Sequence, residues 1–359
     1  MFNLSPEYLF LLVAILAYIA LKPRSWWPFV LLMLVMTFMG VFRGLEVGTD
    51  HLGYEKDFYL LKSWNDMKRM YHGFEIGYVG SILFFKQISN NYLWFSGLTF
   101  LVPMIGTYFF VRTYKVNPAW ALFVFYALGI YFTAFNAMRQ YMAICAIAAF
   151  TPWLYRRKYL AFTVVTVLAS LAFHKSTLFM LTLIPIFWYT QDQKRMLSKK
   201  TLYVGTLISF SLWYVGSIFL IKTLMPVLAL LNLDERYGGY VQNVNENLGN
   251  NISLMNTLFT LAVIYFCPKG KFNGELLIVV FYCWLFNVFN LLSVYATRIA
   301  FPYQYYMIAL FPLIIYALRG YRRFLFSIGV FFYCMLQFIM YYCISNNGDT
   351  NPYTNWLFS

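Results

Sequence analysis

Residues 117–158 read NPAWALFVFYALGIYFTAFNAMRQYMAICAIAAFTPWLYRRK, and this stretch decides the fold. It contains two apolar runs, 117–135 and 138–155, and Arg139 is its one charged residue before the basic cluster at 156–158. Each run approaches the length of about 20 residues that an α-helix needs to cross a bilayer. The stretch therefore predicts two successive membrane-spanning helices, with the basic cluster where the second helix leaves the membrane.

The composition extends this interpretation to the whole chain. Of its 359 residues, 61% are hydrophobic and 11% are charged, whereas soluble domains average about 45–50% and about 25%. So little polar surface does not cover a core of this size, which excludes a cytosolic enzyme, a secreted disulfide scaffold and a disordered chain. The first apolar run carries Lys22 and Arg24 after it, so we expect a retained span and not a cleaved signal peptide.

The apolar runs predict an all-α polytopic membrane protein with about 12 transmembrane helices, forming a single integral membrane domain over residues 1–359. The runs lie near 4–21, 26–42, 91–111, 117–135, 138–155, 159–173, 176–190, 202–222, 252–267, 274–292, 297–318 and 322–344. A further apolar stretch, 76–88, spans only about four turns and is expected to be a short re-entrant or interfacial helix.

The distribution of charge gives a sidedness to these spans. With 12 crossings, one side carries 16 of the 27 cations and only two acids, Asp192 and Glu275. The positive-inside rule makes that side cytoplasmic and places both termini outside. The net charge of +14 is then a topology signal, and no nucleic-acid partner is needed. Two long segments, 43–90 and 223–251, become periplasmic loops.

Three cations are expected where predicted spans begin at the outer face: Arg139, Lys175 and Arg298. A helix N-terminus carries a positive partial charge, so a cation there is unfavourable unless an anion lies nearby. Helix N-termini and arginine side chains both bind phosphate, which makes these residues candidates for substrate binding. The alternative is that they are interfacial anchors whose charged groups reach water.

Two further arginines are weaker candidates for substrate binding. Arg43 begins the sequence Arg-Gly-Leu-Glu-Val-Gly-Thr-Asp-His, whose glycines suggest a tight loop at the membrane surface, although a plain polar connection explains them as well. Arg236 follows Glu235 in the second outer loop, where a pairing with neighbouring charges is the simpler explanation.

Three outer residues are candidates for acid–base catalysis: His174, Asp50 and Glu75. A neutral imidazole at His174 could accept a proton from a hydroxyl nucleophile, and a hydrogen-bonded turn histidine is the alternative. Asp50 and Glu75 are alternative bases or ligands for sugar hydroxyls. The sequence does not give the distances between these three residues, so it assigns no acid–base pair.

Several signatures are absent from the sequence. It has no GxxxxGK[ST], HExxH, GxSxG or GxGxxG motif, and no DxD pair to hold a metal for a nucleotide-sugar donor. The five cysteines show no CxxC spacing. We therefore expect no metal site, no cofactor and no ATP-driven transport.

The order of several short motifs resembles the EpsG/Wzy-type polysaccharide polymerases over residues 40–310. The motifs are Arg43…Gly48-Thr49-Asp50…Tyr54, Gly73-Phe74-Glu75, Asn136-Ala137-Met138-Arg139-Gln140, Phe173-His174-Lys175-Ser176 and Tyr295-Ala296-Thr297-Arg298. The first motif departs from the pattern, with His51-Leu52-Gly53 after Gly-Thr-Asp.

The resemblance implies a polymerase of O-antigen or exopolysaccharide in the bacterial inner membrane. Such an enzyme transfers a glycan chain from an undecaprenyl diphosphate carrier to a lipid-linked repeat unit at the periplasmic face, without a metal. The arginines would hold the diphosphate. Expected partners are the undecaprenyl-diphosphate-linked oligosaccharide, membrane lipid and a chain-length regulator protein. The alternatives are an O-antigen ligase, another lipid-linked glycosyltransferase, or a flippase for lipid-linked oligosaccharide, whose usual two similar halves are not visible here.

Overall fold

The computed structural model describes residues 4–21, 25–69, 75–192, 197–219, 252–268, 270, 272–291, 295–346 and 348–358. These residues form helices joined by turns, and the one β-bridge among them is isolated, between Arg43 and Asn355. The predicted all-α class is therefore confirmed. The whole of the predicted loop 223–251, including Arg236, and residues 73 and 74 of the second motif lie outside the described residues.

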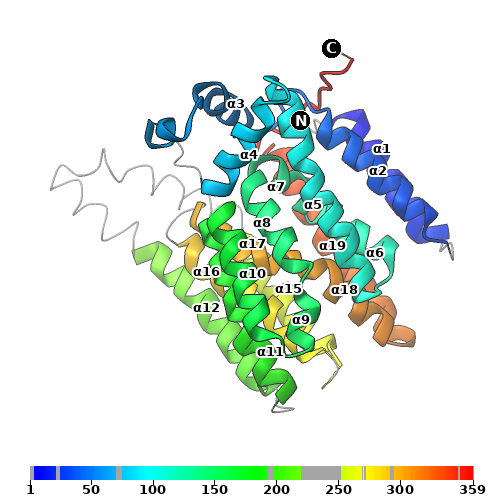
Figure 1. Cartoon of the computed structure of the whole chain (residues 1–359). Coiled ribbons are helices and arrows are strands. Elements are labelled where there is room, and N and C mark those ends of the chain that lie inside the picture. Colours follow the sequence, from blue (N-terminus) through cyan, green and yellow to red (C-terminus); the bar gives the residue numbers. More distant parts are fainter. Residues whose placement is uncertain are drawn as a thin grey trace.

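Each predicted apolar run corresponds to one helix or to a short series of helices (Figure 1). In chain order the elements are α1 (Pro6–Leu21), α2 (Trp27–Val41), α3 (His51–Leu60), η1 (Trp64–Arg69), α4 (Ile76–Lys86), α5 (Tyr92–Tyr114), α6 (Pro118–Ala127), α7 (Ile130–Asn136), α8 (Met138–Ala148), α9 (Thr151–Tyr155), α10 (Tyr159–Ala172), η2 (Lys175–Thr182), α11 (Leu183–Asp192), α12 (Lys199–Phe219), α15 (Ile252–Phe266), α16 (Asn273–Asn290), η4 (Tyr295–Ala300), α17 (Phe301–Tyr305), α18 (Met307–Ala317), α19 (Gly320–Phe338) and η5 (Ile339–Ile344).

Many of the predicted spans are interrupted. The pair α6 and α7 bends by 48° at Gly129, whose φ of +78° only glycine adopts readily, and residues 296–305 and 307–317 bend by 41°. By length and composition, three described helices could cross a membrane, or up to five if each bent pair is one span. The count of about 12 spans therefore stays a prediction.

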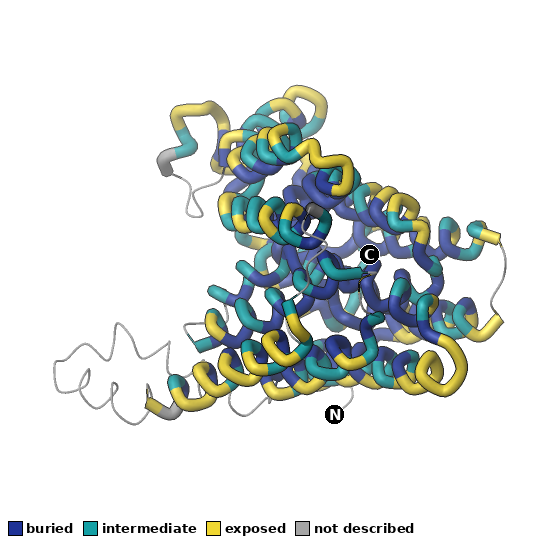
Figure 2. Tube along the Cα trace, turned by 90° about the horizontal axis from the view of Figure 1, so that it is seen from below, coloured by how far each residue is buried: buried dark blue, intermediate teal, exposed yellow. Residues whose placement is uncertain are grey.

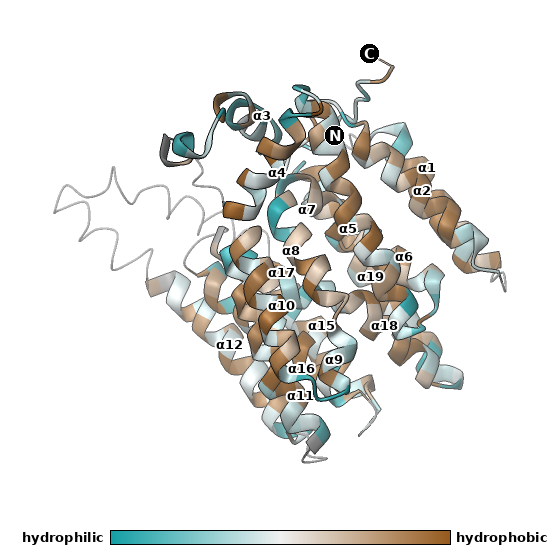
Figure 3. Ribbon diagram, in the orientation of Figure 1, coloured by the Kyte–Doolittle hydropathy of each residue, from teal (hydrophilic) through white to brown (hydrophobic). Residues whose placement is uncertain are grey.

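The outer surface of the bundle is apolar over much of its height, as Figure 3 shows for α1, α2, α5 and α10. Large apolar side chains are exposed on these helices, among them Phe10, Leu31, Phe109 and Leu168. The buried segments run through the middle of the bundle, and the exposed ones follow its edge (Figure 2). A soluble protein rarely exposes so much apolar surface, so this distribution is typical of a helical protein embedded in lipid.

Helix α5 packs closely between α2 and α8. A Cβ atom on Gly97 would lie 2.7 Å from the carbonyl oxygen of Val41, and one on Gly106 would lie 2.6 Å from the Cβ of Cys145. Small residues at such points let two helix backbones approach, which is the common way to pack helices where lipid removes the hydrophobic driving force. This packing fixes the height of α8, which carries Arg139, relative to α2 and α5.

The segment 43–69 contains two helical elements that the sequence did not predict, α3 and η1. The predicted short helix is confirmed as α4, with 11 residues. Buried aromatic side chains join α3, α4, α5 and α8 into a separate apolar cluster, which includes Phe58, Tyr78, Phe95 and Met138. The segment 43–90 is therefore packed onto the helix bundle and provides one wall of the site described below.

The basic loops gather at one end of the bundle, which we call the basic end. Lys199 donates hydrogen bonds from Nζ to the carbonyl oxygens of Tyr265 and Cys267, and the Arg322 guanidinium lies 5.9 Å from the ring centroid of Tyr265. The loops near residues 198, 267 and 320 therefore lie together, as the charge distribution predicts for one side of a membrane.

Candidate functional site

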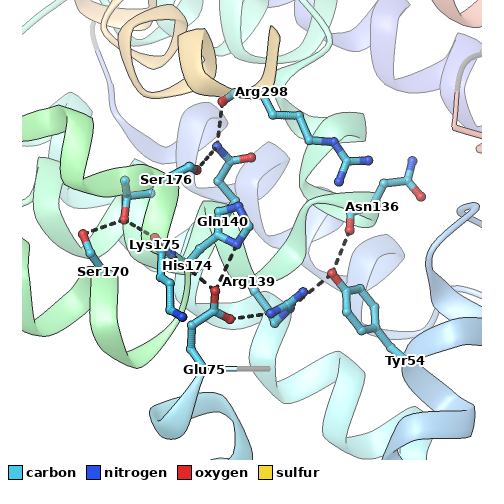
Figure 4. Close-up of polar contacts among 11 residues, drawn as sticks. Tyr54, Glu75, Asn136, Arg139, Gln140, Ser170, His174, Lys175, Ser176 and Arg298 are labelled. Carbon is cyan, nitrogen blue, oxygen red and sulfur yellow. Dashed lines mark hydrogen bonds and ion pairs between the residues drawn. The ribbon is translucent and has the colours of Figure 1, made fainter. Parts of the chain in front are cut away.

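Arg139 and Glu75 form an ion pair at the opposite end of the bundle (Figure 4). Arg139 is the second residue of α8, as predicted for a cation at a helix start, and Glu75 directly precedes α4. Both side chains are nearly buried, with 11% and 7% of their surface exposed. The Arg139 guanidinium also lies over the rings of Tyr54 and Tyr78, at 5.6 Å and 5.7 Å from their centroids. The N-terminus of α8 and the Arg139 side chain are both positive. The Glu75 carboxylate and the two ring faces supply the negative charge that balances them.

The second oxygen of Glu75 faces His174 and Lys175. Nδ1 of His174 lies 3.6 Å from Oε1 of Glu75, and the backbone N–H of Lys175 donates to the same oxygen at 3.3 Å. Burial alone would raise the pKa of Glu75, but the neighbouring His174 and Arg139 outweigh it and lower the pKa below its ordinary value. Glu75 is therefore an anion held between a guanidinium and an imidazole.

Arg298 and Asp50 form a second, more open ion pair. Nη2 of Arg298 lies 3.6 Å from Oδ2 of Asp50, and about a third of each side chain is exposed, 33% and 32%. Asp50 is the residue before α3. Arg298 is the fourth residue of η4, which begins at Tyr295, two residues before the start of the predicted span 297–318. Because this pair is open, its members are accessible to a ligand.

Gln140 connects the elements that carry these residues. Its Nε2 donates to Oγ of Ser176 at 3.1 Å and to the backbone carbonyl of Arg298 at 2.7 Å. It thereby joins α8 to η2 and η4, the two short helices that follow His174 and carry Arg298 (Figure 4).

Asn136 fixes the loop that carries Asp50. Its Oδ1 accepts from Oγ1 of Thr49 at 3.3 Å and from the N–H of Asp50 at 3.4 Å, while its Nδ2 donates to the carbonyl of Gly348 at 3.0 Å. Residues 348–358, which we call the C-terminal tail, also pair with this loop through N–H groups of Gly48 and Thr49. Asp50 thus depends on a segment about 300 positions away in the chain.

Arg43 lies beneath these residues and not among them. It is 1% exposed, its guanidinium lies 5.4 Å and 5.1 Å from the ring centroids of Phe100 and Phe135, and its Nη2 donates to Oγ of Ser96 at 3.0 Å. His51 shares that hydroxyl at 2.8 Å. Burial and the nearby Arg43 lower the pKa of His51 to about 2, so this imidazole is neutral. Both residues support the loop 44–50 from below.

The structure thus brings together six of the eight residues proposed from the sequence: Asp50, Glu75, Arg139, His174, Lys175 and Arg298. The Lys175 side chain is exposed at the edge of this group. Arg43 is close by but buried, and Arg236 lies outside the described residues. Among the described residues, no group of three or more His, Cys, Asp or Glu side chains could hold a metal ion.

A family model now bears on this site. The model of the EpsG family matches residues 26–355. The chain belongs to the EpsG family. No curated protein and no solved structure matches it.

The match to the EpsG family confirms the resemblance drawn from the motifs, and it includes every residue of the site. It also includes Asn136 and Gln140, which the sequence analysis quoted within a motif without assigning them a role. One signal could have singled them out. With Arg139 they are the polar residues of 134–142 other than Tyr141, and they stand at the junction between two predicted apolar runs.

Proposed function

We propose that this EpsG-family chain is a polysaccharide polymerase that transfers a glycan from an undecaprenyl diphosphate carrier to a lipid-linked repeat unit. Family membership supports the polymerase-type function. The observation that carries the finer proposal is the convergence of two arginines, a histidine and two carboxylates at one end of an apolar bundle. They come from the residues just before α3, α4 and η2, from the start of α8 and from η4.

Arg298 is the proposed ligand of the donor diphosphate. Its pair with Asp50 is a third exposed and 3.6 Å long, so a diphosphate can replace or join the carboxylate without breaking a buried contact. As the bond from the anomeric carbon to the diphosphate breaks, negative charge grows on the leaving oxygen. A guanidinium already in place stabilises that charge, and its planar fork matches two phosphate oxygens. Arg139, at the start of α8, would assist Arg298 in stabilising the charge on the diphosphate, although Glu75 partly neutralises the charge of Arg139.

His174 is the proposed base. When its Nδ1–H points at Glu75, the other ring nitrogen is an acceptor, so the carboxylate selects the tautomer that can take a proton. In the reaction His174 accepts the proton of the acceptor hydroxyl, and the hydroxyl oxygen bonds to the anomeric carbon. The carrier diphosphate leaves with the electron pair of the broken bond. A basic group positioned in this way typically contributes about 100- to 10,000-fold to a rate.

The charge distribution supports a periplasmic location for this site. The cations at 156–158, 199–200 and 319–323 and the residues of the site belong to opposite sides in the predicted topology, and the positive-inside rule puts the basic side in the cytoplasm. The lipid carriers and membrane lipid are then the partners nearest the site, and a chain-length regulator protein is the proposed protein partner.

The test is reconstitution of the purified chain in liposomes with lipid-linked repeat units. We expect a ladder of products that differ by one repeat unit, and we expect His174→Ala to lose the ladder while remaining in the membrane. Transfer to lipid A core without a ladder would identify a ligase, and movement of the repeat unit across the bilayer without new glycosidic bonds would identify a flippase. Either result would overturn the proposal.

A further inference from the structure

A cavity of about 870 Å³ lies at the basic end, far from the site. It is bounded by the start of α2, the end of α5, the start of α6 and the turn between α18 and α19, in the lower right of Figure 1. Helix α5 joins this cavity to the site: Ser96, which binds Arg43, and Arg112, which lines the cavity, are about 24 Å apart along the helix axis. The cavity therefore opens near the other membrane surface.

Among the described residues, the charged side chains that line the cavity are all cations: Arg112, Lys115 and Arg323. Within the described part of the chain, none of the three forms an ion pair. The two arginines contact aromatic groups instead. The Arg112 guanidinium lies 5.2 Å from the ring centroid of Trp26, and that of Arg323 lies 5.5 Å from the centroid of Tyr316. Three cations without carboxylate partners around one cavity create a positive potential that favours an anion.

The rest of the lining is apolar and aromatic. Ile19, Val116, Trp120 and Leu313 form walls beside the cations. Tyr316, at the mouth, is 70% exposed. Tryptophan and tyrosine are enriched at the interface between acyl chains and headgroups, and arginine side chains often reach it. A soluble anion would satisfy the cations but would leave the apolar walls without a ligand, whereas a lipid supplies both parts.

We propose that this cavity binds an anionic phospholipid, with its phosphate among Arg112, Lys115 and Arg323 and the upper part of an acyl chain against the apolar walls. The volume lies within the range of about 300–1,000 Å³ that is usual for small-molecule sites. Basic pockets between helices on the cytoplasmic side are a known way to hold lipid headgroups. This inference does not depend on the proposed function, because it concerns the opposite end of the bundle and its test measures binding.

The test is binding of phosphatidylglycerol with brominated chains to the full chain in detergent, followed by quenching of tryptophan fluorescence. Each cation at such a surface strengthens binding about fivefold, so the double substitution Arg112→Ala/Arg323→Ala should weaken binding about 25-fold. The charge-conserving pair Arg112→Lys/Arg323→Lys should retain most of the affinity. Arg156→Ala is the matched control: it removes an exposed cation from the basic loops that does not line the cavity, and it should leave binding unchanged.

Three results would overturn the proposal. They are equal binding by the wild type and the double alanine variant, equal binding of phosphatidylethanolamine with the same chains, and displacement of the lipid by millimolar inorganic phosphate. The last would identify a site for a soluble anion.

A second measurement uses the wild-type chain alone, in case the variants do not fold. Photoactivatable phosphatidylglycerol should label peptides covering 108–120 or 312–323, and labelling confined to other segments would contradict the assignment.

Discussion

Gln140 donates a 2.7 Å hydrogen bond to the backbone carbonyl of Arg298, although 158 positions separate the two residues in the chain. The same amide nitrogen holds Ser176, two residues after His174. The proposed base and the proposed diphosphate ligand are therefore both positioned from α8. Charge-conserving and neutral substitutions of the site residues distinguish residues that act in the reaction from residues that stabilise the fold.

Arg298→Lys should remove most of the polymerase activity while the protein remains at normal abundance. Lysine keeps the positive charge but loses the planar fork that binds two phosphate oxygens. Loss of one such contact in the transition state lowers a rate by about 100- to 1,000-fold. The measurement is the rate of ladder formation from lipid-linked repeat units, with Arg156→Lys at the basic end as the control. A normal ladder from Arg298→Lys would show that charge or anchoring alone is required there.

Glu75→Gln should destabilise the protein by about 3 kcal/mol, because it leaves Arg139 nearly buried without its anion. Thermal unfolding in detergent measures this loss. Glu55→Gln on α3 is a suitable control, because Glu55 forms no ion pair with any other residue of the described ranges. If the two substitutions lower the unfolding temperature equally, the pair with Arg139 does not contribute to stability.

The same carboxylate predicts a pH dependence. The pKa of Glu75 is lowered in the folded protein from its ordinary value of 4.5. A group with a depressed folded pKa stabilises the fold above its unfolded pKa, and this contribution is lost as the pH falls through the folded pKa. Acidification from about pH 6 to about pH 3 should therefore narrow the stability difference between the wild type and Glu75→Gln. A difference that stays constant over this interval would contradict the assignment.

Gly348→Ala should disconnect the C-terminal tail from the site. A Cβ atom there would lie 2.1 Å from Nδ2 of Asn136, and the φ of +84° is already unfavourable for alanine. Gly320→Ala separates the clash with Asn136 from the backbone strain. Gly320 also has a positive φ, +52°, but it has nothing within 4 Å of its Cβ position. We expect activity to fall only in Gly348→Ala, and similar losses in both variants would point to backbone strain alone.

Single-cysteine labelling tests the sidedness. The five native cysteines are buried, so a background without them should fold if each is replaced by a residue of similar size. Ser63→Cys and Ser198→Cys both lie at exposed positions, in the segment 43–90 and at the basic end. An impermeant thiol reagent should label the first and not the second in intact cells. The reverse pattern would invert the topology.

Polymerisation should continue in excess chelator. The prediction rests on the absence of a carboxylate pair suited to a divalent ion in the sequence and on the arginines that could balance the diphosphate charge instead. The reconstituted reaction is measured with and without chelator, and then with magnesium or manganese restored. Activity that disappears and returns with the metal would show that the arginines do not suffice.

The apolar runs predicted the helices well, because a run of apolar residues without charges has few other stable structures in lipid. They did not reveal the bend at Gly129 or the helices α3 and η1. The sequence of α3, HLGYEKDFYL, lacks a clear apolar face, and its stability comes from packing on α4 and α5. The pattern of apolar residues within a short segment carries no information on contacts with other helices.

Charge counting also placed the candidate residues on one face, since it depends only on the order of spans. It could not pair Glu75 with Arg139 or Asp50 with Arg298, because pairing depends on the relative rotation and height of helices. The location of Arg43 shows the same limit. A cation at a helix end was taken to face the membrane surface, but the rings of Phe100 and Phe135 accommodate it inside.

The attachment of the C-terminal tail to Asn136 and the Gly48 loop has a consequence for biosynthesis. A ribosome translates residues 348–358 after every helix described here, so the loop carrying Asp50 reaches its final form only after the helix bundle has been inserted. Incomplete chains, whether from premature termination or from proteolysis of the tail, would have the bundle but an unfinished site. If the proposed function is correct, nascent and damaged copies should bind the lipid-linked donor poorly.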